Sequence, residues 1–395
     1  MRSLLLPLAA AVTLVVTAGC SVRPSEPVEP TAAGSPTAPA DAGTRPAAAA
    51  GGFRVTVSGE DYAATGFDFT PGVSTAYGDP PAFVDGWSIR FEHILVTVAN
   101  VEVHAEPDLD PTNAAKVGAS LARDEGAYAV DLVRGGDVAG KSGAPRDRAV
   151  AITELPGYGP SSTPFDPGAR YAFGYETVAA SAAAKRVNLD AAGEQLYAEA
   201  IAKGWAMVYV GTATYEGPPP DPSSVFAKMP SKVSFRLGFA NPASYRNCRN
   251  TDLPKVGGKY PRGIRPSADG AVTVQITFHT DHVFWNRLDT DGTPLFFDAI
   301  AASSPAFGGA SGGAVTMDDL ARVDITDVRS RSGERVPPRS HVADYAAPSG
   351  PLVFDAQTTR FARPNAFSSF LSYAAVSTGH MNAFGVCEIE RHFVP

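Results

Sequence analysis

The stretch WSIRFEHILVTVANVEVH, residues 87–104, is the strongest β-strand signal in the chain and decides the expected fold. Alternation puts two apolar sets on opposite faces of an extended strand, Ile89, Phe91 and Leu95 on one face and Ile94, Val96 and Val98 on the other. A strand that is apolar on both faces at its centre is typical of an interior strand with a packed layer on each side. This segment therefore favours a β-sandwich.

Further runs of strand length lie on both sides of this segment, at residues 53–58, 170–177, 206–214, 232–239 and 271–278. The stretches between them are rich in glycine and proline, of which the chain has 38 and 34, as in a domain with many loops. We expect a mainly β, sandwich-like domain with a few inserted helices, spanning residues 53–395.

Three segments carry helical signals. Residues 189–203 have apolar side chains at helical spacing, with Asn188 as the expected N-cap and Gly204 as the stop. Residues 365–376 predict a shorter helix, and residues 295–323 have the outline of a helix–loop–helix.

The N-terminus has the three parts of an export signal. Arg2 supplies a positive charge, residues 4–16 are apolar, and small residues precede Cys20. Thr17-Ala-Gly-Cys20 resembles the bacterial lipobox, although the family pattern prefers Leu where Thr17 stands. The resemblance implies a signal peptide at residues 1–19 and lipidation of Cys20. A plain secretory signal with a coincidental cysteine is the alternative.

Residues 20–52 carry the lipidated cysteine and a spacer rich in proline and alanine, which we expect to be disordered. The lipid at Cys20 would attach the protein to a membrane in the cell envelope. In a Gram-negative organism, Ser21 does not resemble the aspartate that retains lipoproteins at the inner membrane, so the outer membrane is expected. An envelope protein partner is left open. The net charge of −8 and the lack of a basic stripe argue against nucleic acid.

Export also determines how the three cysteines are interpreted. With Cys20 acylated, Cys248 and Cys387 remain as an even pair in an oxidising compartment, which predicts a disulfide. This bond would tie the end of the chain to its middle. Two buried free thiols are the alternative.

The most informative local motif is His279-Thr-Asp281-His282, at the end of the strand predicted at residues 271–278. Phe278 faces the core, so His279 projects from the opposite face, and a turn into a helix at Asp281 would bring His282 back toward it. Neutral imidazoles with a carboxylate are ligands suited to transition metals, zinc or copper above all. Two solvated histidines that cap a helix are the alternative.

A third histidine, His380, precedes Cys387 by a few residues. The predicted disulfide would hold this segment against the middle of the chain and bring His380 toward the other two. The predicted metal ligands are therefore His279, Asp281, His282 and His380. Alternatively, His380 only occupies a glycine-bounded turn.

Several of these segments, in order, resemble uncharacterised lipid-anchored cell-envelope lipoproteins of high-GC bacteria. The resemblance is carried by residues 87–98, Cys248, His279-Thr-Asp-His282 and Gly379-His-Met-Asn up to Cys387. It implies no activity.

Two classes of function remain after this comparison. The first is a cell-envelope lipoprotein that binds a transition metal ion through clustered histidines, for metal acquisition. The second is a non-catalytic adhesion or carbohydrate- or protein-binding module with structural histidines. No catalytic residue is predicted, because Gly309-Ala-Ser311-Gly-Gly313 has the letters of a nucleophile elbow without its strand–turn–helix context. Whether the protein is an enzyme is left open, with the balance against it.

Overall fold

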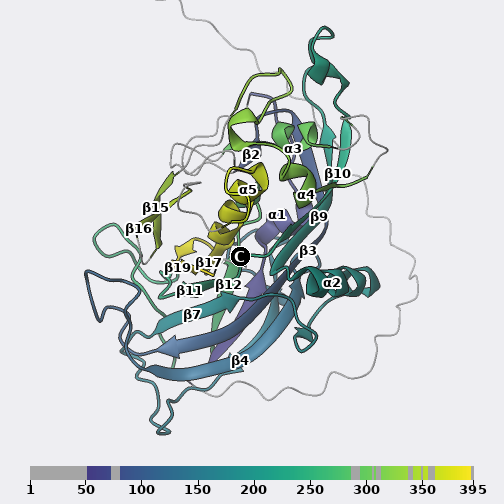
Figure 1. Ribbon diagram of the computed structural model, residues 1–395. Helices are drawn as coiled ribbons and strands as arrows, with labels where there is room; N and C mark the ends of the chain where they lie inside the picture. The colour runs from purple at the N-terminus through teal and green to yellow at the C-terminus, as the bar shows by residue number, and fades with distance from the viewer. Residues whose placement is uncertain are drawn as a thin grey trace, which may run out of the picture. The chain divides into compact units, whose positions relative to one another are not determined.

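A computed structural model describes residues 51–72, 81–285, 294–304, 307, 313–336, 341–347, 350–354 and 361–392 (Figure 1). The predicted signal peptide, Cys20 and nearly all of the spacer lie outside these residues and stay predictions. Ser311, for which no catalytic role was predicted, lies outside them as well. Ala47 to Pro395 form one compact unit. Among the described helices, none has the length and apolar character needed to cross a membrane.

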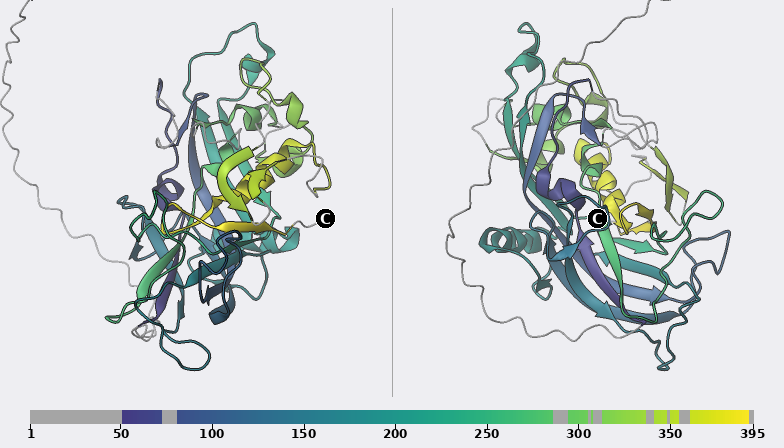
Figure 2. Two further views of the ribbon diagram at one scale, coloured as in Figure 1. Left: turned by 90° about the vertical axis from the view of Figure 1, so that its left-hand side faces the viewer. Right: turned by 180° about the vertical axis from the view of Figure 1, so that it is seen from behind.

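The first of two large sheets positions the histidines. Within the described residues it has six strands, in the spatial order β18-β17-β12-β1-β6-β5. Their bounds are β1 Phe53–Ser58, β5 Val138–Ala139, β6 Arg148–Leu155, β12 Val272–Phe278, β17 Gly379–Met381 and β18 Gly385–Val386. The central strands β1 and β12 are parallel, with Ser58 level with Thr277, and they run side by side when the molecule is viewed from behind (Figure 2).

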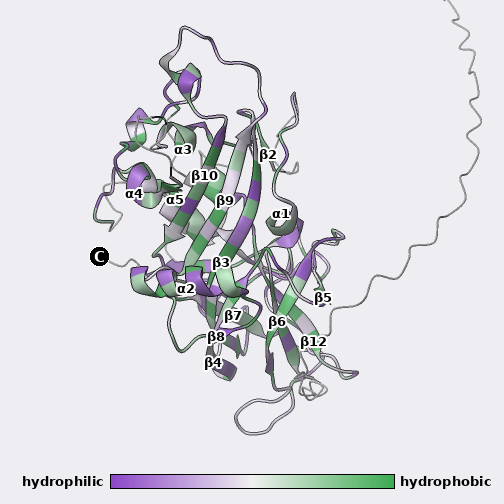
Figure 3. Cartoon of the chain, turned by 90° about the vertical axis from the view of Figure 1, so that its right-hand side faces the viewer, coloured by the Kyte–Doolittle hydropathy of each residue, from purple (hydrophilic) through white to green (hydrophobic). Residues whose placement is uncertain are grey.

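The second sheet is built around β3, which matches the predicted segment Trp87–His104. Its order is β14-β10-β9-β3-β7-β11-β19, with β4 paired to β3 and β8 paired to β4. The other bounds are β4 Ser120–Asp131, β7 Ala172–Thr177, β8 Lys185–Arg186, β9 Met207–Tyr215, β10 Lys232–Phe239, β11 Ala243–Arg246, β14 Val315–Thr316 and β19 Glu388–Arg391. Hydrophobic and hydrophilic residues follow one another along β3, β9 and β10 (Figure 3).

Short elements complete the described chain. Two further strand pairs are β2 Ala82–Phe83 with β13 Pro294–Leu295, and β15 His341–Ala347 with β16 Gly350–Val353. The α-helices are α1 Glu60–Thr65, α2 Ala191–Lys203, α3 Asp298–Ala302, α4 Met317–Leu320 and α5 Phe367–Ala375. The 3-10 helices are η1 Val225–Lys228, η2 His282–Phe284, η3 Ile325–Asp327 and η4 Val376–Thr378.

The two large sheets share one hydrophobic core, as a sandwich requires. Val55 of β1, Ile276 of β12 and Val96 of β3 are among its buried members. A second, smaller cluster joins the other face of β3 to α2, where Leu95 packs with Leu196. The predicted mainly β, sandwich-like fold with a few helices is therefore confirmed.

The faces predicted for β3 are wrong in part. Ile89 belongs to the same core as Ile94 and Val96, and only Leu95 of the predicted first face packs under α2. The pairing of β3 with β9 shifts between Phe91 and His93, because a β-bulge inserts one extra residue there. One extra residue reverses which face each later side chain occupies.

Helix α2 begins two residues later than predicted, and its N-cap is Asp190. The Asp190 carboxylate accepts a hydrogen bond from the Gly193 N–H at 2.8 Å, which satisfies one of the first-turn donors. Asn188 instead holds the end of β4, because its side chain both accepts from the Asp131 N–H and donates to the Asp131 carbonyl. Gly204 ends the helix in the left-handed conformation, as predicted.

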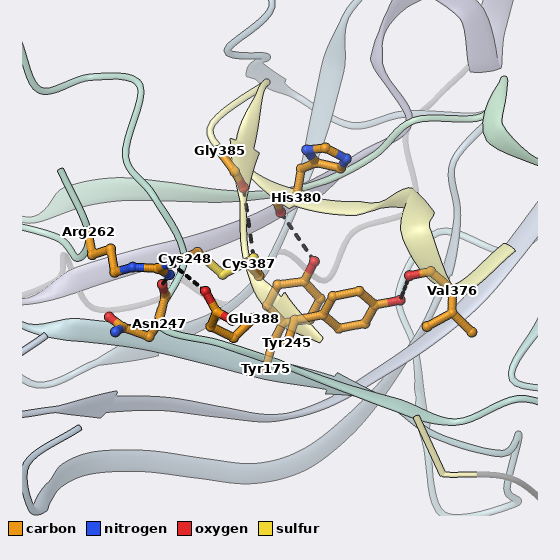
Figure 4. Close-up of a disulfide and its surroundings, with 10 residues drawn as sticks. All are labelled: Tyr175, Tyr245, Asn247, Cys248, Arg262, Val376, His380, Gly385, Cys387 and Glu388. Carbon is orange, nitrogen blue, oxygen red and sulfur yellow. Dashed lines mark hydrogen bonds and ion pairs between the residues drawn. A yellow bond between two sulfur atoms is a disulfide. The ribbon is translucent and has the colours of Figure 1, made fainter. Parts of the chain in front are cut away.

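The C-terminal segment is tied to the middle of the chain. A disulfide joins Cys248 to Cys387, the predicted pair. Nearby, the Tyr175 hydroxyl donates to the carbonyl oxygen of His380 at 3.2 Å, and the Tyr245 hydroxyl donates to that of Val376 at 2.9 Å. Figure 4 shows the imidazole of His380 pointing away from the disulfide, while the carbonyl oxygen of His380 accepts the hydrogen bond from Tyr175.

Candidate metal centre

The end of β12 supplies two of the three predicted histidines. The strand ends at Phe278, the chain turns, and the one-turn helix η2 begins at His282 with Asp281 before it. The Phe284 N–H donates to the Asp281 carbonyl at 2.8 Å and closes this turn. The turn folds His282 back toward His279, as the sequence predicted, although the helix is a single 3-10 turn.

The third histidine arrives through strand pairing. Strand β17 runs antiparallel to β12, with His380 opposite Thr277 and Gly379 opposite Phe278. The His279 N–H continues the pairing by donating to the Thr378 carbonyl at 2.9 Å. His380 therefore lies on the strand next to β12, beside the strand end that carries His279.

The three histidines form one cluster that can hold a metal ion. One ring nitrogen from each of His279, His282 and His380 lies within 4.8 Å of those of the other two. His282 and His380 are 2% and 3% exposed, whereas the side chain of His279 keeps 12% of its surface accessible. An ion would therefore reach the cluster past His279.

Hydrogen bonds determine which nitrogen two of these rings can offer. Nδ1 of His282 lies 3.0 Å from the carbonyl oxygen of Ser377, which cannot donate, so Nδ1 carries the proton and Nε2 the lone pair. Nε2 of His279 lies 2.8 Å from the carbonyl oxygen of Ala383, so the lone pair of that ring is on Nδ1. Metal-binding histidines generally donate their other N–H to such an oxygen, which orients the ring.

Burial keeps two of the imidazoles neutral. It lowers the pKa of His282 and of His380 well below the usual value, and the charge of neighbouring His279 acts in the same direction. Hydrogen bonding to the Ser377 backbone opposes both shifts. Neutral imidazole is the form that binds a metal ion, so these side chains are available as ligands at neutral pH.

The predicted fourth ligand, Asp281, is not a member of this cluster. It is buried, and its Oδ2 accepts a hydrogen bond from the indole Nε1 of Trp285 at 3.3 Å. Burial raises its pKa, and the charge of His279 opposes that shift. Trp285 also lies against His282, with 3.8 Å between ring centroids, so Asp281 acts on the cluster by holding this indole.

A carboxylate that the sequence motifs missed, that of Glu60, lies beside His279. Its Oε1 is 3.7 Å from Nε2 of His279 and has no hydrogen-bond partner among the described residues. The parallel strands β1 and β12 place Ser58 level with Thr277, so the residues two positions further on leave the sheet at the same edge. An acidic residue two positions after an alternating strand was the available signal, but only knowledge of this pairing makes it useful.

A buried asparagine holds the turn between β17 and β18. Asn382 has a positive φ of 48°, and its Oδ1 accepts from the Gln275 N–H at 2.9 Å. Its Nδ2 donates to Asn250 at 2.9 Å and to Asp252 at 3.0 Å. The next residue, Ala383, supplies the carbonyl that orients His279. Asn382 therefore determines where this acceptor lies.

Two hollows of the described surface lie elsewhere. One, of about 480 Å³, is lined by charged residues that include Asp108, Arg170 and Arg265. The other, of about 520 Å³, lies between residues 69–72 and 216–218. Neither is lined by a histidine of the cluster.

Comparison of the chain with protein-family models, curated proteins and solved structures found no match.

Proposed function

We propose that this protein is a lipid-anchored cell-envelope protein that captures a transition metal ion through His279, His282 and His380. The observation that carries the proposal is the geometry of the cluster, in which ring nitrogens of all three residues lie within 4.8 Å of one another. Two of the rings are oriented by backbone carbonyls, as metal-binding histidines commonly are.

The ligand chemistry favours zinc or copper. Neutral imidazole suits Zn²⁺, Cu²⁺, Ni²⁺ and iron, whereas Mg²⁺ and Ca²⁺ prefer oxygen ligands. Burial around His282 and His380 makes a hydrated ion exchange its water for nitrogen ligands. The pairing of β12 with β17 draws these ligands from distant parts of the chain, so the bound ion would link them and stabilise the folded protein.

The test is metal binding by the metal-free domain, residues 51–395. We expect one Zn²⁺ or Cu²⁺ per chain in native mass spectrometry, with a rise in melting temperature. Binding at about 100 times Kd adds about 2.7 kcal/mol to the free energy of unfolding. His279→Gln, His282→Gln and His380→Gln should each lower the affinity strongly.

His104→Gln is the matched control, because His104 lies at the far end of β3 and contacts Glu102 at 3.1 Å. It should bind like the wild type. A wild-type domain that retains no stoichiometric metal would contradict the proposal, as would cluster variants that bind as tightly as the control. A binding module with structural histidines would then be preferred.

A further inference from the structure

The distances between the three rings show that one pair is too close for a shared ion. With metal–nitrogen distances of about 2.0–2.1 Å and tetrahedral angles, imidazole centroids lie roughly 5 Å apart. The centroid of His282 lies at about this distance from those of His279 and His380, at 5.3 and 5.5 Å. The rings of His279 and His380 are stacked at 4.1 Å, with 14° between their planes. This stack has to open by about 1 Å, because a metal lies in the plane of each ring it binds.

The ring that moves is His279. His282 is held between two contacts, the hydrogen bond to Ser377 and the stack on Trp285. His380 is buried on a paired strand. His279 is the most exposed of the three, and its outer neighbour is Phe384, whose surface is 62% exposed. Rotation of His279 therefore displaces the least packed material.

Glu60 is placed to receive the rotated ring. The bond between Nε2 of His279 and the Ala383 carbonyl belongs to the stacked position, and rotation weakens it. Oε1 of Glu60 is 3.7 Å from the same nitrogen, so about 0.8 Å of movement makes a normal hydrogen bond. The Glu60 side chain is nine-tenths buried, and Oε1 has no other partner among the described residues, which is costly for a carboxylate.

The backbone conformation of Glu60 also supports a functional role for this residue. Its φ of +58° lies in the left-handed region, which side chains other than glycine rarely adopt. Such strain is kept where the surrounding structure imposes it, and it is often found at functional sites. The residue before it, Gly59, leaves no room for a side chain, since a Cβ there would lie 2.6 Å from that of Ala63. Glycine is therefore the residue that fits at position 59, directly before Glu60 enters the site.

We propose that Glu60 is the positioning residue of the metal site. On metal binding, the hydrogen bond donated by Nε2–H of His279 changes its acceptor from the Ala383 carbonyl to the Glu60 carboxylate. The resulting carboxylate–histidine–metal arrangement fixes the ring with Nδ1 toward the ion. Glu60 itself does not bind the ion. This inference rests on the proposed function.

The experiment measures Zn²⁺ affinity by competition with a chromogenic chelator. Glu60→Ala should weaken binding by about 10–100-fold, the usual effect of removing such a partner. Glu60→Gln keeps an acceptor oxygen and should restore most of the affinity. In a His279→Ala background, Glu60→Ala should have no further effect. Glu154→Ala is the control, since Glu154 is a partly buried carboxylate on β6 that contacts Arg54; it should bind like the wild type.

A second readout separates positioning from a structural role. The melting temperature of the metal-free Glu60→Ala protein should not fall, because Oε1 accepts no hydrogen bond that the change would remove. Equal affinity of Glu60→Ala and wild type would overturn the inference while leaving the metal site intact. Loss of affinity that Glu60→Gln fails to restore would identify a direct ligand and also overturn it, as would an effect that persists without His279. Failure of the wild type to bind would instead reject the proposed function.

Discussion

Thr277 and His380 are direct partners in the antiparallel pairing of β12 with β17. This pairing brings the third histidine to the other two, and the disulfide acts further along the chain, at Cys387 beyond β18. The sequence had assigned the delivery of His380 to the disulfide alone. In the structure the strand pairing positions the histidine, and the disulfide holds the hairpin that contains it.

This division of roles predicts that stability and metal binding respond differently to loss of the disulfide. Cys248→Ala with Cys387→Ala opens a loop with a sequence separation of 139, and chain entropy puts the cost at about 4–5 kcal/mol of unfolding free energy. Metal affinity of the folded variant should stay within several-fold of wild type. Denaturant unfolding and chelator competition measure the two effects. Loss of binding at a denaturant concentration where the variant is folded would contradict this, as would free thiols in the wild-type protein.

Asn382→Ala should weaken stability more than metal binding. The change leaves the buried Gln275 N–H without its partner, at about 1–3 kcal/mol, whereas Oδ1 of Asn250 keeps the hydrogen bond from the Asp252 N–H. It also puts alanine at a φ of 48°, which costs roughly 1–2 kcal/mol more. Metal affinity should fall much less, because in the proposed metal-bound site the Nε2–H of His279 is held by Glu60 and not by the Ala383 carbonyl. Asn382→Gly should recover the backbone part of the loss only. Thermal unfolding with and without Zn²⁺ measures this, and equal losses for both variants would show that backbone strain plays no part.

Much of the fold follows from the sequence where one signal dominates. Strand β3 has the predicted bounds, β12 begins one residue later than predicted, and α5 falls within residues 365–376. Strand β4 was missed, because its first half carries Arg123, Asp124 and Glu125 and its burial is confined to the second half. The bulges in β3 were missed as well, since an alternating pattern cannot show where one residue is added.

In the candidate site, too, residues placed by a local pattern could be predicted, and a residue placed by distant strand pairing could not. His279 and His282 are close in sequence, and a strand end followed by a turn was enough to predict that they face each other. The position of His380 was predicted from the cysteine pair. The predicted position was right, but the strand pairing that produces it was not foreseen. Glu60 could not be predicted, because its place depends on the parallel pairing of β1 with β12, strands that lie far apart in the chain. Local patterns carry no information about such a partner.

The membrane anchor is a prediction from Thr17-Ala-Gly-Cys20 alone. Cys20→Ala should move the protein from the membrane fraction to the soluble fraction, because a lipid on this sulfur is the anchor that the sequence offers. Fractionation of expressing cells followed by a salt wash measures the distribution. Cys20→Ser is a second variant with the same expected result. A Cys20→Ala protein that stays with membranes after the wash would reject the lipoprotein assignment.

The final prediction concerns acid stability of the metal-free protein. Burial lowers the pKa of His282 and His380 far below 6.5, so at mildly acidic pH the unfolded chain binds protons that the folded chain does not. Their contribution to stability is therefore complete above about pH 6.5 and falls as the pH drops below it. At pH 5.5 the loss is on the order of 1 kcal/mol for each residue. Glu60 and Asp281 act in the opposite direction, because burial raises their pKa values.

A comparison with a variant isolates the histidines from these carboxyl groups. Urea unfolding of wild type and of the His282→Gln/His380→Gln protein, both metal-free, should be measured at pH 7.5 and pH 5.5. The wild type should lose up to about 3 kcal/mol more than the variant between these values, since only it carries the two imidazoles that protonate on unfolding. Saturating Zn²⁺ should raise stability at both pH values but leave the wild-type loss at least as large, because the bound ion keeps the ring nitrogens unprotonated in the folded chain while the unfolded chain still takes up protons. Parallel pH dependence of the two proteins would mean that the buried rings are protonated in the folded state, and a site of neutral imidazoles would then be rejected.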